Sequence, residues 1–287
     1  MWNIIGTRTD YETIWDGIGH GFPEIETRQV PIDEASFLCL HAPWFPDKEP
    51  RVYIKTGLSF LACVRLAAIH YRFVLQPLNS ISVKRWEVQY QDILDWIYWA
   101  KHIDYIVALS TLKSGAGYPL GIHAQSFPYL SYLSCHPMSF LPDVPREILV
   151  PFQIMPRFRK IQISFLHKYL APALCLESDD SPEGLTQIAE KTYELALNYD
   201  QLKAFNLVII PSSYSLQVYF FPRRRDGHAI FGNSRWQVAG LEFAGILLCR
   251  EKEKFEKINE SIIRDLFSKI SINAEELDIL QNLVSSF

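Results

Sequence analysis

Residues 114–125 read Ser114-Gly-Ala-Gly-Tyr-Pro-Leu-Gly-Ile-His-Ala-Gln125, a glycine-rich turn that runs into a short strand. Side chains alternate between the two faces of a strand, so Gly121, His123 and Gln125 share one face, opposite Ile122 and Ala124. Glycines in the turn allow backbone N–H groups to approach an anion closely. An imidazole nucleophile, an amide donor and an anion-binding turn are thus expected near one point. This combination favours chemistry at a phosphorus atom.

Length and charge limit the classes of function. A chain of 287 residues is long enough for one large domain or two fused halves. The net charge of −4 gives no general argument for a nucleic-acid or membrane surface, and we expect neither partner. The N-terminus lacks the basic and apolar pattern of a signal peptide. The apolar stretch at residues 97–112 is interrupted by charges and too short to span a bilayer.

Cysteine usage indicates a reducing compartment. Five cysteines are scattered widely, with no C-x-x-C pair: Cys39, Cys63, Cys135, Cys175 and Cys249. An odd number without close pairs argues against a disulfide framework and against a zinc knuckle. We therefore expect a soluble, cytoplasmic protein without a bound metal.

The elements expected along the first part of the chain are mostly strands. Residues 1–50 are rich in glycine, proline and aromatic residues and are expected to form an irregular arm with short strands. The domain proper is expected at 51–287, with halves at about 51–136 and 161–287. In its first half we expect strands at 51–55, 59–66, 69–76 and 105–109, and a helix at 86–100.

A long crossing loop is expected at 137–156. After it, the second half is expected to combine strands and helices as the first half does. A helix begins at Ser181, a good N-cap followed by proline, and runs to about Tyr199. Residues 205–211 and 215–222 are expected to form a β-hairpin. Two helices close the chain, one at 252–270 and one with the capping-box pair Asn273 and Glu276. The pattern indicates an α+β fold with a mostly antiparallel sheet.

The order of these motifs resembles the histidine-triad superfamily. The residues that carry the likeness are Tyr71-Arg-Phe-Val-Leu-Gln-Pro77, a helix, a strand, Ser114-Gly-Ala-Gly117 and His123-Ala-Gln125. It looks closest to the branch of hexose-1-phosphate uridylyltransferases, diadenosine tetraphosphate phosphorylases and GDP-sugar phosphorylases. That branch has the signature His-x-His-x-Gln, whose second histidine is the nucleophile. Residues 205–210, 218–223 and 241–250 resemble its C-terminal parts, and 250–279 resembles the GDP-L-galactose phosphorylase type.

One position departs from the family signature, because Gly121 stands where its first histidine would be. In the uridylyltransferases that histidine can ligate a structural metal, so the glycine gives a second reason to expect no zinc. In the superfamily, the other ring nitrogen of the nucleophile donates to the main-chain carbonyl of this first position. A glycine still supplies a carbonyl, so we expect His123 to keep its tautomer and orientation.

The resemblance implies covalent catalysis at His123. The imidazole would attack the α-phosphorus of a nucleotide-sugar or dinucleoside polyphosphate and form a nucleotidyl-histidine, which inorganic phosphate then takes up. Ping-pong kinetics and no cofactor are expected. Gln125 donates a hydrogen bond to phosphate but cannot transfer a proton, and this favours transfer to phosphate over hydrolysis.

Further residues are candidates for binding the substrate. The glycine turn offers Lys113, Ser114, Gly115, Gly117 and Gly121, although a plain strand-to-strand turn has the same appearance. Arg72 and Gln76 lie on the strand before the first helix, where they could line a nucleotide pocket, although Arg72 could equally be an exposed strand residue. Arg223 begins a triple-arginine loop and matches the family's Pro-Arg, yet such a loop is more often a solvated turn.

Three alternatives remain open at this point. His123 could be a partly buried strand histidine bonded to backbone without chemistry. The chain could be a hydrolase of the same bonds, or a degenerate member that binds a nucleotide or a protein partner. The resemblance also allows a homodimer.

Overall fold

The computed structural model describes residues 6–18, 25–33, 35–41, 53–64, 69, 71–79, 85, 87–111, 121–130, 139–150, 154–155, 158–159, 161–166, 169–200, 204–224, 229–231, 234–236 and 238–285. Its helices are α1 (Arg8–Ile18), α3 (Tyr90–Ile103), α4 (Pro182–Asp200), α5 (Gly240–Phe243), α6 (Lys252–Lys257), α7 (Glu260–Ile270) and α8 (Ala274–Ser285), with a 3-10 turn at Leu141–Asp143. No helix among these described residues is long and apolar enough to cross a membrane.

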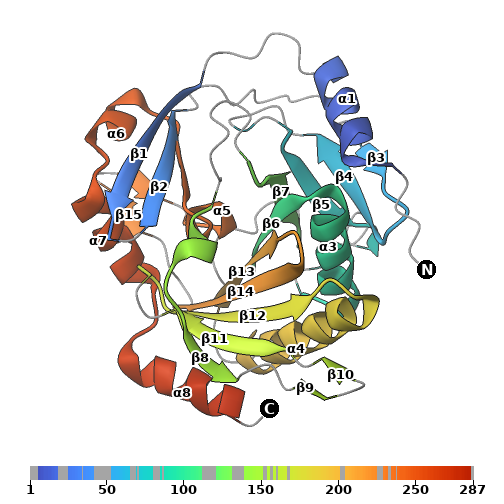
Figure 1. The fold of residues 1–287 in the computed structure, drawn as a ribbon. Coiled ribbons are helices and arrows are strands. Elements are labelled where there is room, and N and C mark those ends of the chain that lie inside the picture. Colours follow the sequence, from blue (N-terminus) through green and yellow to red (C-terminus); the bar gives the residue numbers. More distant parts are fainter. Residues whose placement is uncertain are drawn as a thin grey trace.

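A ten-stranded sheet forms the centre of the molecule (Figure 1). Its strands lie in the order β3-β4-β5-β7-β6-β13-β14-β12-β11-β8. Their bounds are β3 (Tyr53–Lys55), β4 (Phe60–Val64), β5 (Phe73–Pro77), β6 (Tyr105–Ser110), β7 (Ala124–Pro128), β8 (Glu147–Val150), β11 (Gln162–Leu166), β12 (Ala173–Asp179), β13 (Ala204–Pro211) and β14 (Ser215–Arg223). All ladders of this sheet are antiparallel.

The sheet is built from two halves with the same order of elements. Strands β4 and β5, helix α3, and strands β6 and β7 make the first half; β11, β12, α4, β13 and β14 repeat that sequence in the second. The halves join where β6 pairs with β13, with Ala108 opposite Val208. From this central pair outward, the strand order on one side mirrors the order on the other. The expected fusion of two halves is confirmed by this topology.

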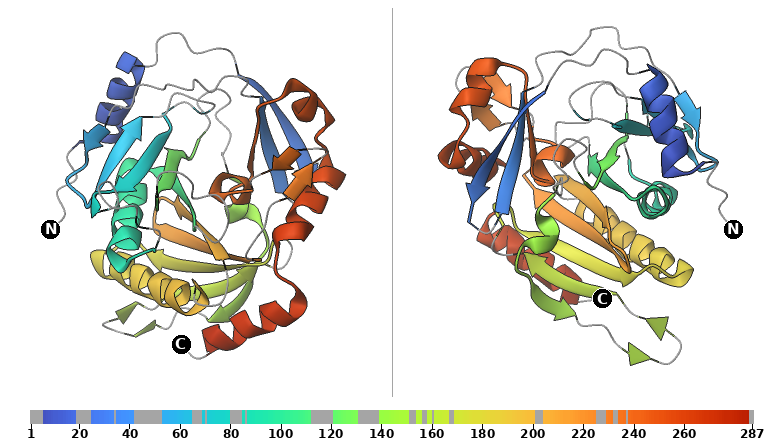
Figure 2. Two further views of the ribbon diagram at one scale, coloured as in Figure 1. Left: turned by 180° about the vertical axis from the view of Figure 1, so that it is seen from behind. Right: turned by 45° about the horizontal axis from the view of Figure 1, so that its top comes forward.

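Two apolar layers cover the two faces of the sheet (Figure 2). Helices α3 and α4 pack on one face, where Trp96 and Trp99 are fully buried. The other face carries α5, α7 and a small sheet of β1 (Glu26–Ile32), β2 (Ala35–His41) and β17 (Ile246–Cys249). Because side chains alternate along each strand, these layers decide which residues of a strand face which side.

Three expectations for local structure were wrong. Residues 1–50 contain the expected short strands, β1 and β2, but they are not an irregular arm: they also form α1, whose Tyr11 and Trp15 are buried against the main core, and β2 pairs with β17. The segment expected as a crossing loop contains β8, which pairs with β11. The helix expected at 252–270 is divided in two, because Asn259 caps a new helix through its Oδ1, which accepts from the Ile262 N–H at 3.0 Å.

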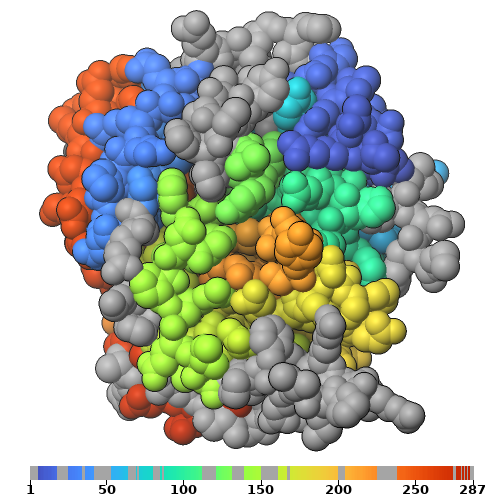
Figure 3. Space-filling view, in the orientation of Figure 1, coloured from blue at the N-terminus to red at the C-terminus, as the bar shows by residue number. Residues whose placement is uncertain are grey.

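Other expectations were confirmed with small shifts of boundary. Helix α4 begins at Pro182 with Ser181 Oγ accepting from the Gly184 N–H at 3.0 Å. The β13–β14 hairpin has the expected bounds to within one residue, and its turn reaches the surface between α3 and α4 (Figure 3). The strand expected at 69–76 starts only at Phe73, because Tyr71 has a φ of +57° that breaks extended backbone.

Two further pairs of strands lie outside the main sheet. They are β9 (Ile154–Met155) with β10 (Phe158–Arg159), and β15 (Ala229–Phe231) with β16 (Ser234–Trp236).

Candidate active site

His123 lies directly before β7, on a turn that presents its ring to a main-chain carbonyl. Its Nδ1 is 2.9 Å from Gly121 O. A carbonyl oxygen only accepts hydrogen bonds, so Nδ1 carries the proton and donates. In the neutral ring, Nε2 is then the nitrogen with the lone pair. The contact expected between His123 and the carbonyl of Gly121 is confirmed, although Gly121 replaces the histidine of the family signature.

The turn before His123 is fixed from two sides. Gly121 has a φ of +79°, in the left-handed region that glycine adopts without strain. The Ile122 N–H donates to Arg85 O at 2.7 Å. The Ile122 side chain is buried in the core beneath α3. His123 is half-buried and follows Ile122, so its side chain is directed toward the opposite face.

Alternation along β7 places Gln125 on the same face as His123. Ser126 faces α3, where its Oγ accepts from Trp99 Nε1 at 2.8 Å, and Phe127 belongs to the other apolar layer. Gln125 therefore lies between Val74 of β5 and Ala108 of β6, which are its partners in the two ladders. Its Oε1 is buried and accepts no hydrogen bond within the part of the chain that the structure describes.

The neighbouring strands bring polar side chains alongside His123. Ala124 pairs with Leu75 on one side and with Leu109 on the other. Gln76 and Ser110 are the next residues along these two strands, so they lie at the same end of the two ladders as His123. Gln76 of β5 and Arg72, which directly precedes β5, are 7% and 5% exposed. That Arg72 and Gln76 line a nucleotide pocket stays a prediction.

A buried polar network continues from Ser110 across the same face. Ser110 Oγ accepts from Asn206 Nδ2 at 2.7 Å and from the Gly240 N–H at 2.8 Å. Asn206 Oδ1 accepts from Arg223 Nη1 at 3.1 Å. Gly240 packs so closely on β6 that an added Cβ would lie 3.0 Å from the Leu109 nitrogen. The network thus fixes the start of α5 against the strand that flanks His123.

Arg223 has a different environment from the one expected. It was expected to contact phosphate from a surface loop, but it is the last residue of β14 and is 0% exposed. Its Nη1 also donates to Val238 O at 2.6 Å. Burial lowers the pKa of Arg223 to about 10, an effect that nearby Glu242 partly offsets. The observed contacts give Arg223 the role of holding the segment before α5.

Glu242 is a buried carboxyl group at the same end of the sheet. Its Oε2 accepts from the Ala239 N–H at 2.7 Å. Burial raises its pKa to about 7, against the opposing effects of the Ala239 hydrogen bond and of the positive charges of Arg72 and Arg223. An acidic group that titrates near neutrality is thereby coupled to Arg72, on the face that carries His123.

The remaining candidates lie outside the described residues. These are the members of the glycine-rich turn before Gly121: Lys113, Ser114, Gly115 and Gly117. Their part in binding phosphate stays a prediction.

Comparison of the coordinates with solved structures identifies the fold. The crystal structure of yeast Ap4A phosphorylase Apa2 in complex with AMP matches with a TM-score of 0.62 and 12% identity, over 94% of this chain and 98% of that chain. The chain has the Ap4A phosphorylase fold. The complex of the same enzyme with Ap4A matches with a TM-score of 0.59 and 13% identity, over 92% and 96% of the two chains. The expected α+β fold with an antiparallel sheet and packed helices is confirmed.

Sequence comparison supports the same branch. Residues 147–287, slightly less than half of the chain, match the family model described as GDPGP1-like, C-terminal domain. In the Ap4A phosphorylase fold of this chain, these residues carry the second half of the sheet from β8 onward, together with α4 to α8. A search of curated protein sequences found no match.

Sequence reasoning missed several residues that shape the site within this Ap4A phosphorylase fold. Arg85 contacts the His123 turn through its main chain, while Ser110 and Asn206 form the polar network on the strands beyond it. Asn206 carried a signal, because an amide inside the apolar run 205–210 must find a buried partner. Arg85 had none, since its contact is made by a backbone carbonyl. In the described part of the chain, no group of three or more His, Cys, Asp or Glu side chains is placed to hold a metal.

Proposed function

We propose that this chain is a nucleotidyltransferase of the phosphorylase type that acts through a nucleotidyl-histidine on His123. The observation that carries the proposal is the hydrogen bond of His123 Nδ1 to Gly121 O, which directs the lone pair to Nε2. The substrate is a nucleotide-sugar or a dinucleoside polyphosphate, and inorganic phosphate is the acceptor. The similarity to a GDPGP1-like domain and to a phosphorylase solved with AMP and Ap4A supports this class of substrate.

The first step forms one bond and breaks one. The Nε2 lone pair attacks the α-phosphorus, and the bond from that phosphorus to the bridging oxygen breaks. The electron pair leaves with the departing phosphate compound. The ring keeps its proton on Nδ1 and becomes cationic, so the hydrogen bond to Gly121 O strengthens as the bond forms. No general base is needed on the protein for this step.

In the second step, an oxygen of inorganic phosphate attacks the same phosphorus. The N–P bond breaks, its electrons return to Nε2, and a nucleoside diphosphate is released. Gln125 is proposed to donate from its amide nitrogen to a non-bridging oxygen in both steps, while Arg72 and Gln76 line the nucleotide pocket. The turn residues Lys113, Ser114, Gly115 and Gly117 are proposed to contact the phosphates.

A trapping experiment tests the proposal. The protein is mixed with Ap4A or with GDP-sugars and denatured, and its intact mass is measured by mass spectrometry. We expect a nucleotidyl adduct that His123→Ala abolishes and that His102→Ala, at an exposed position of α3, retains. Discharge of the adduct by phosphate with release of nucleoside diphosphate supports the phosphorylase. Discharge by water alone indicates the hydrolase, and no adduct with any substrate contradicts the proposal.

A further inference from the structure

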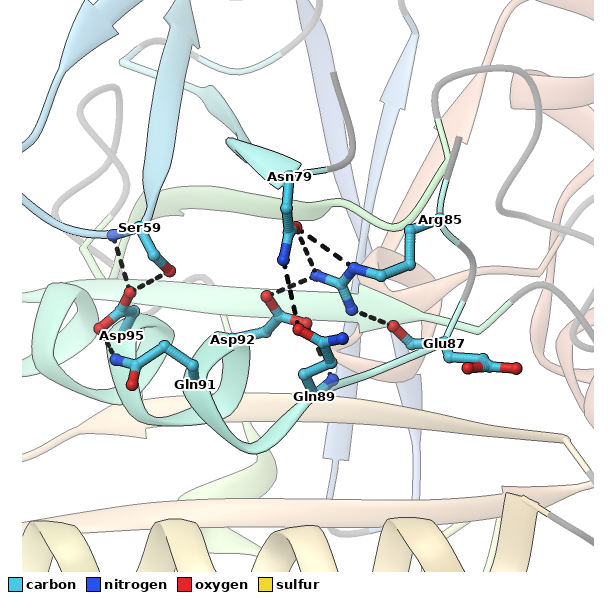
Figure 4. Close-up of polar contacts among 8 residues, drawn as sticks. All are labelled: Ser59, Asn79, Arg85, Glu87, Gln89, Gln91, Asp92 and Asp95. Atoms are coloured by element: carbon cyan, nitrogen blue, oxygen red, sulfur yellow. Dashed lines mark hydrogen bonds and ion pairs between the residues drawn. The ribbon is translucent and has the colours of Figure 1, made fainter. Parts of the chain in front are cut away.

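A second group of residues, Arg85 with its hydrogen-bond partners Asn79, Glu87 and Asp92, lies around the start of α3 (Figure 4). Arg85 precedes α3, and its carbonyl oxygen accepts the Ile122 N–H at 2.7 Å. The ladders of β7 begin only at Ala124, so residues 121–123 lie beyond the regular pairing of the sheet. The position of Arg85 O therefore helps to set where the carbonyl of Gly121 and the ring of His123 lie.

The side chain of Arg85 is held by contacts within the protein. Nη2 donates to Asp92 Oδ1 at 2.8 Å and to Asn79 Oδ1 at 2.9 Å. Nε donates to Asn79 Oδ1 at 3.2 Å, and Nη1 donates to the carbonyl oxygen of Glu87. Each guanidinium nitrogen thus has a protein acceptor. This indicates a residue that fixes backbone rather than one that binds phosphate.

Asp92 is the buried partner in this arrangement. Its side chain is 2% exposed, against 14% for Arg85. Its Oδ2 accepts from the Gln89 N–H at 2.9 Å at the start of α3, so the carboxylate ties the helix to Arg85. Burial raises the pKa of Asp92, and the bonds from Gln89 and Arg85 oppose that rise. Removing either member of a charge pair this buried leaves the other charge without its partner and destabilises the fold.

We propose that Arg85, held by Asp92, is a positioning residue that sets the orientation of the His123 imidazole through the Ile122 main chain. The proposal rests on the proposed function for its catalytic consequence only. The path runs from Asp92 to the Arg85 guanidinium, through the Arg85 carbonyl to Ile122, and from there to the Gly121–His123 hydrogen bond. Small displacements of a reacting group cost up to about 100-fold in rate.

The same helix offers a matched control. Asp95 is also buried on α3, where it accepts from the Ser59 N–H at 2.8 Å and from Gln91 Nε2 at 2.8 Å. Neither Ser59 nor Gln91 touches the His123 turn in the contacts of the described residues. Asp95→Asn therefore removes a comparable buried charge from α3 and leaves every hydrogen bond of Arg85 and Asp92 in place, its only effect on the pair being the lost repulsion between Asp95 and Asp92.

The experiment compares Asp92→Asn, Arg85→Lys and Asp95→Asn with the unchanged protein. Two readouts need no activity: hydrogen exchange of the Ile122 amide, and the tautomer of His123 from its ring nitrogen shifts in NMR. We expect Asp92→Asn and Arg85→Lys to speed Ile122 exchange beyond any global loss of stability and to mix the His123 tautomers. Asp95→Asn should leave both unchanged after correction for stability.

The catalytic readout is the single-turnover rate of nucleotidyl transfer. We expect about a 10- to 100-fold fall for Asp92→Asn, with nucleotide affinity within about 2-fold, and no such fall for Asp95→Asn. The double variant Arg85→Lys with Asp92→Asn should be no slower than the slower single variant. The inference would be overturned if Asp92→Asn and Asp95→Asn slowed the reaction equally. It would also be overturned if Asp92→Asn and Arg85→Lys left both the Ile122 amide exchange and the His123 tautomer unchanged. If the unchanged protein forms no adduct, the proposed function fails while the two NMR readouts still decide the inference.

Discussion

The oxygen of Gly121 and the Nδ1 of His123, two residues apart in sequence, lie 2.9 Å apart. In this structure the carbonyl is supplied by Gly121 in left-handed backbone, with a φ of +79°. A β-carbon in that conformation meets the following carbonyl oxygen, at a cost of about 1–2 kcal/mol. The signature histidine of the resembling family would be strained at this position in the present backbone.

Gly121→Ala should therefore lower the free energy of unfolding by about 1–2 kcal/mol in urea denaturation. Gly17 in α1 is the control, because nothing lies within 4 Å of an added Cβ there. Gly17→Ala is expected to leave stability unchanged or to raise it by up to about 1 kcal/mol. Equal stability of Gly121→Ala and the unchanged protein would contradict the assigned backbone strain.

Gln125→Ala should slow turnover by about 100-fold or more while nucleotide binding stays largely intact. The reason is that the proposed hydrogen bond strengthens as charge develops on the phosphate oxygens. Steady-state kinetics and calorimetric binding measure the two quantities separately. Gln162→Ala, on β11 of the other half, is the control and should change neither. Lost binding with normal turnover would refute the role given to Gln125.

The raised pKa of Glu242 predicts that the stability of the fold depends on pH. Its folded pKa of about 7 lies above the unfolded value of 4.5, so the folded state binds an extra proton between these values. The contribution of Glu242 to the free energy of unfolding is therefore fully present below about pH 4.5. It is lost as the pH rises to about 7, by roughly 3 kcal/mol in total. Glu242→Gln should remove this fall, measured as the difference between the two unfolding curves from pH 5 to 8. Parallel curves would show that Glu242 is ionised throughout.

Arg223→Lys should destabilise the protein by about 1–3 kcal/mol without weakening nucleotide binding. Lysine cannot keep both contacts of Nη1, with Asn206 Oδ1 and Val238 O. The adjacent Arg224 is exposed, and Arg224→Lys should stay within about 0.5 kcal/mol of the unchanged protein. Thermal denaturation and a nucleotide titration separate the two roles. Weaker binding at full stability would restore the interpretation of Arg223 as a substrate contact.

The elements that the sequence predicts well are those with local causes. Ser181 caps α4. Asn273 and Glu276 form a capping box, in which the Glu276 N–H donates to Asn273 Oδ1 at 2.9 Å and the Asn273 N–H donates to Glu276 Oε2 at 3.0 Å. The pairing of β2 with β17 joins residues more than 200 positions apart, and no local pattern specifies it. Polar neighbours of His123 follow from such long-range registers. The motif was therefore visible in the sequence, whereas Ser110 beside it and Arg85 behind it were not.

The mirrored order of strands has a consequence for stoichiometry. In the row that crosses the junction of the halves, Gln125 pairs with Ala108, and Tyr219 occupies the equivalent place beside Val208. Tyr219 is fully buried and donates to Gln217 Oε1 at 2.7 Å, so this duplicate place is closed by its own side chains. Under the proposed function, the saturated protein accordingly carries one nucleotidyl group per polypeptide, on His123. The second half of the sheet then supports the first half without carrying out the reaction.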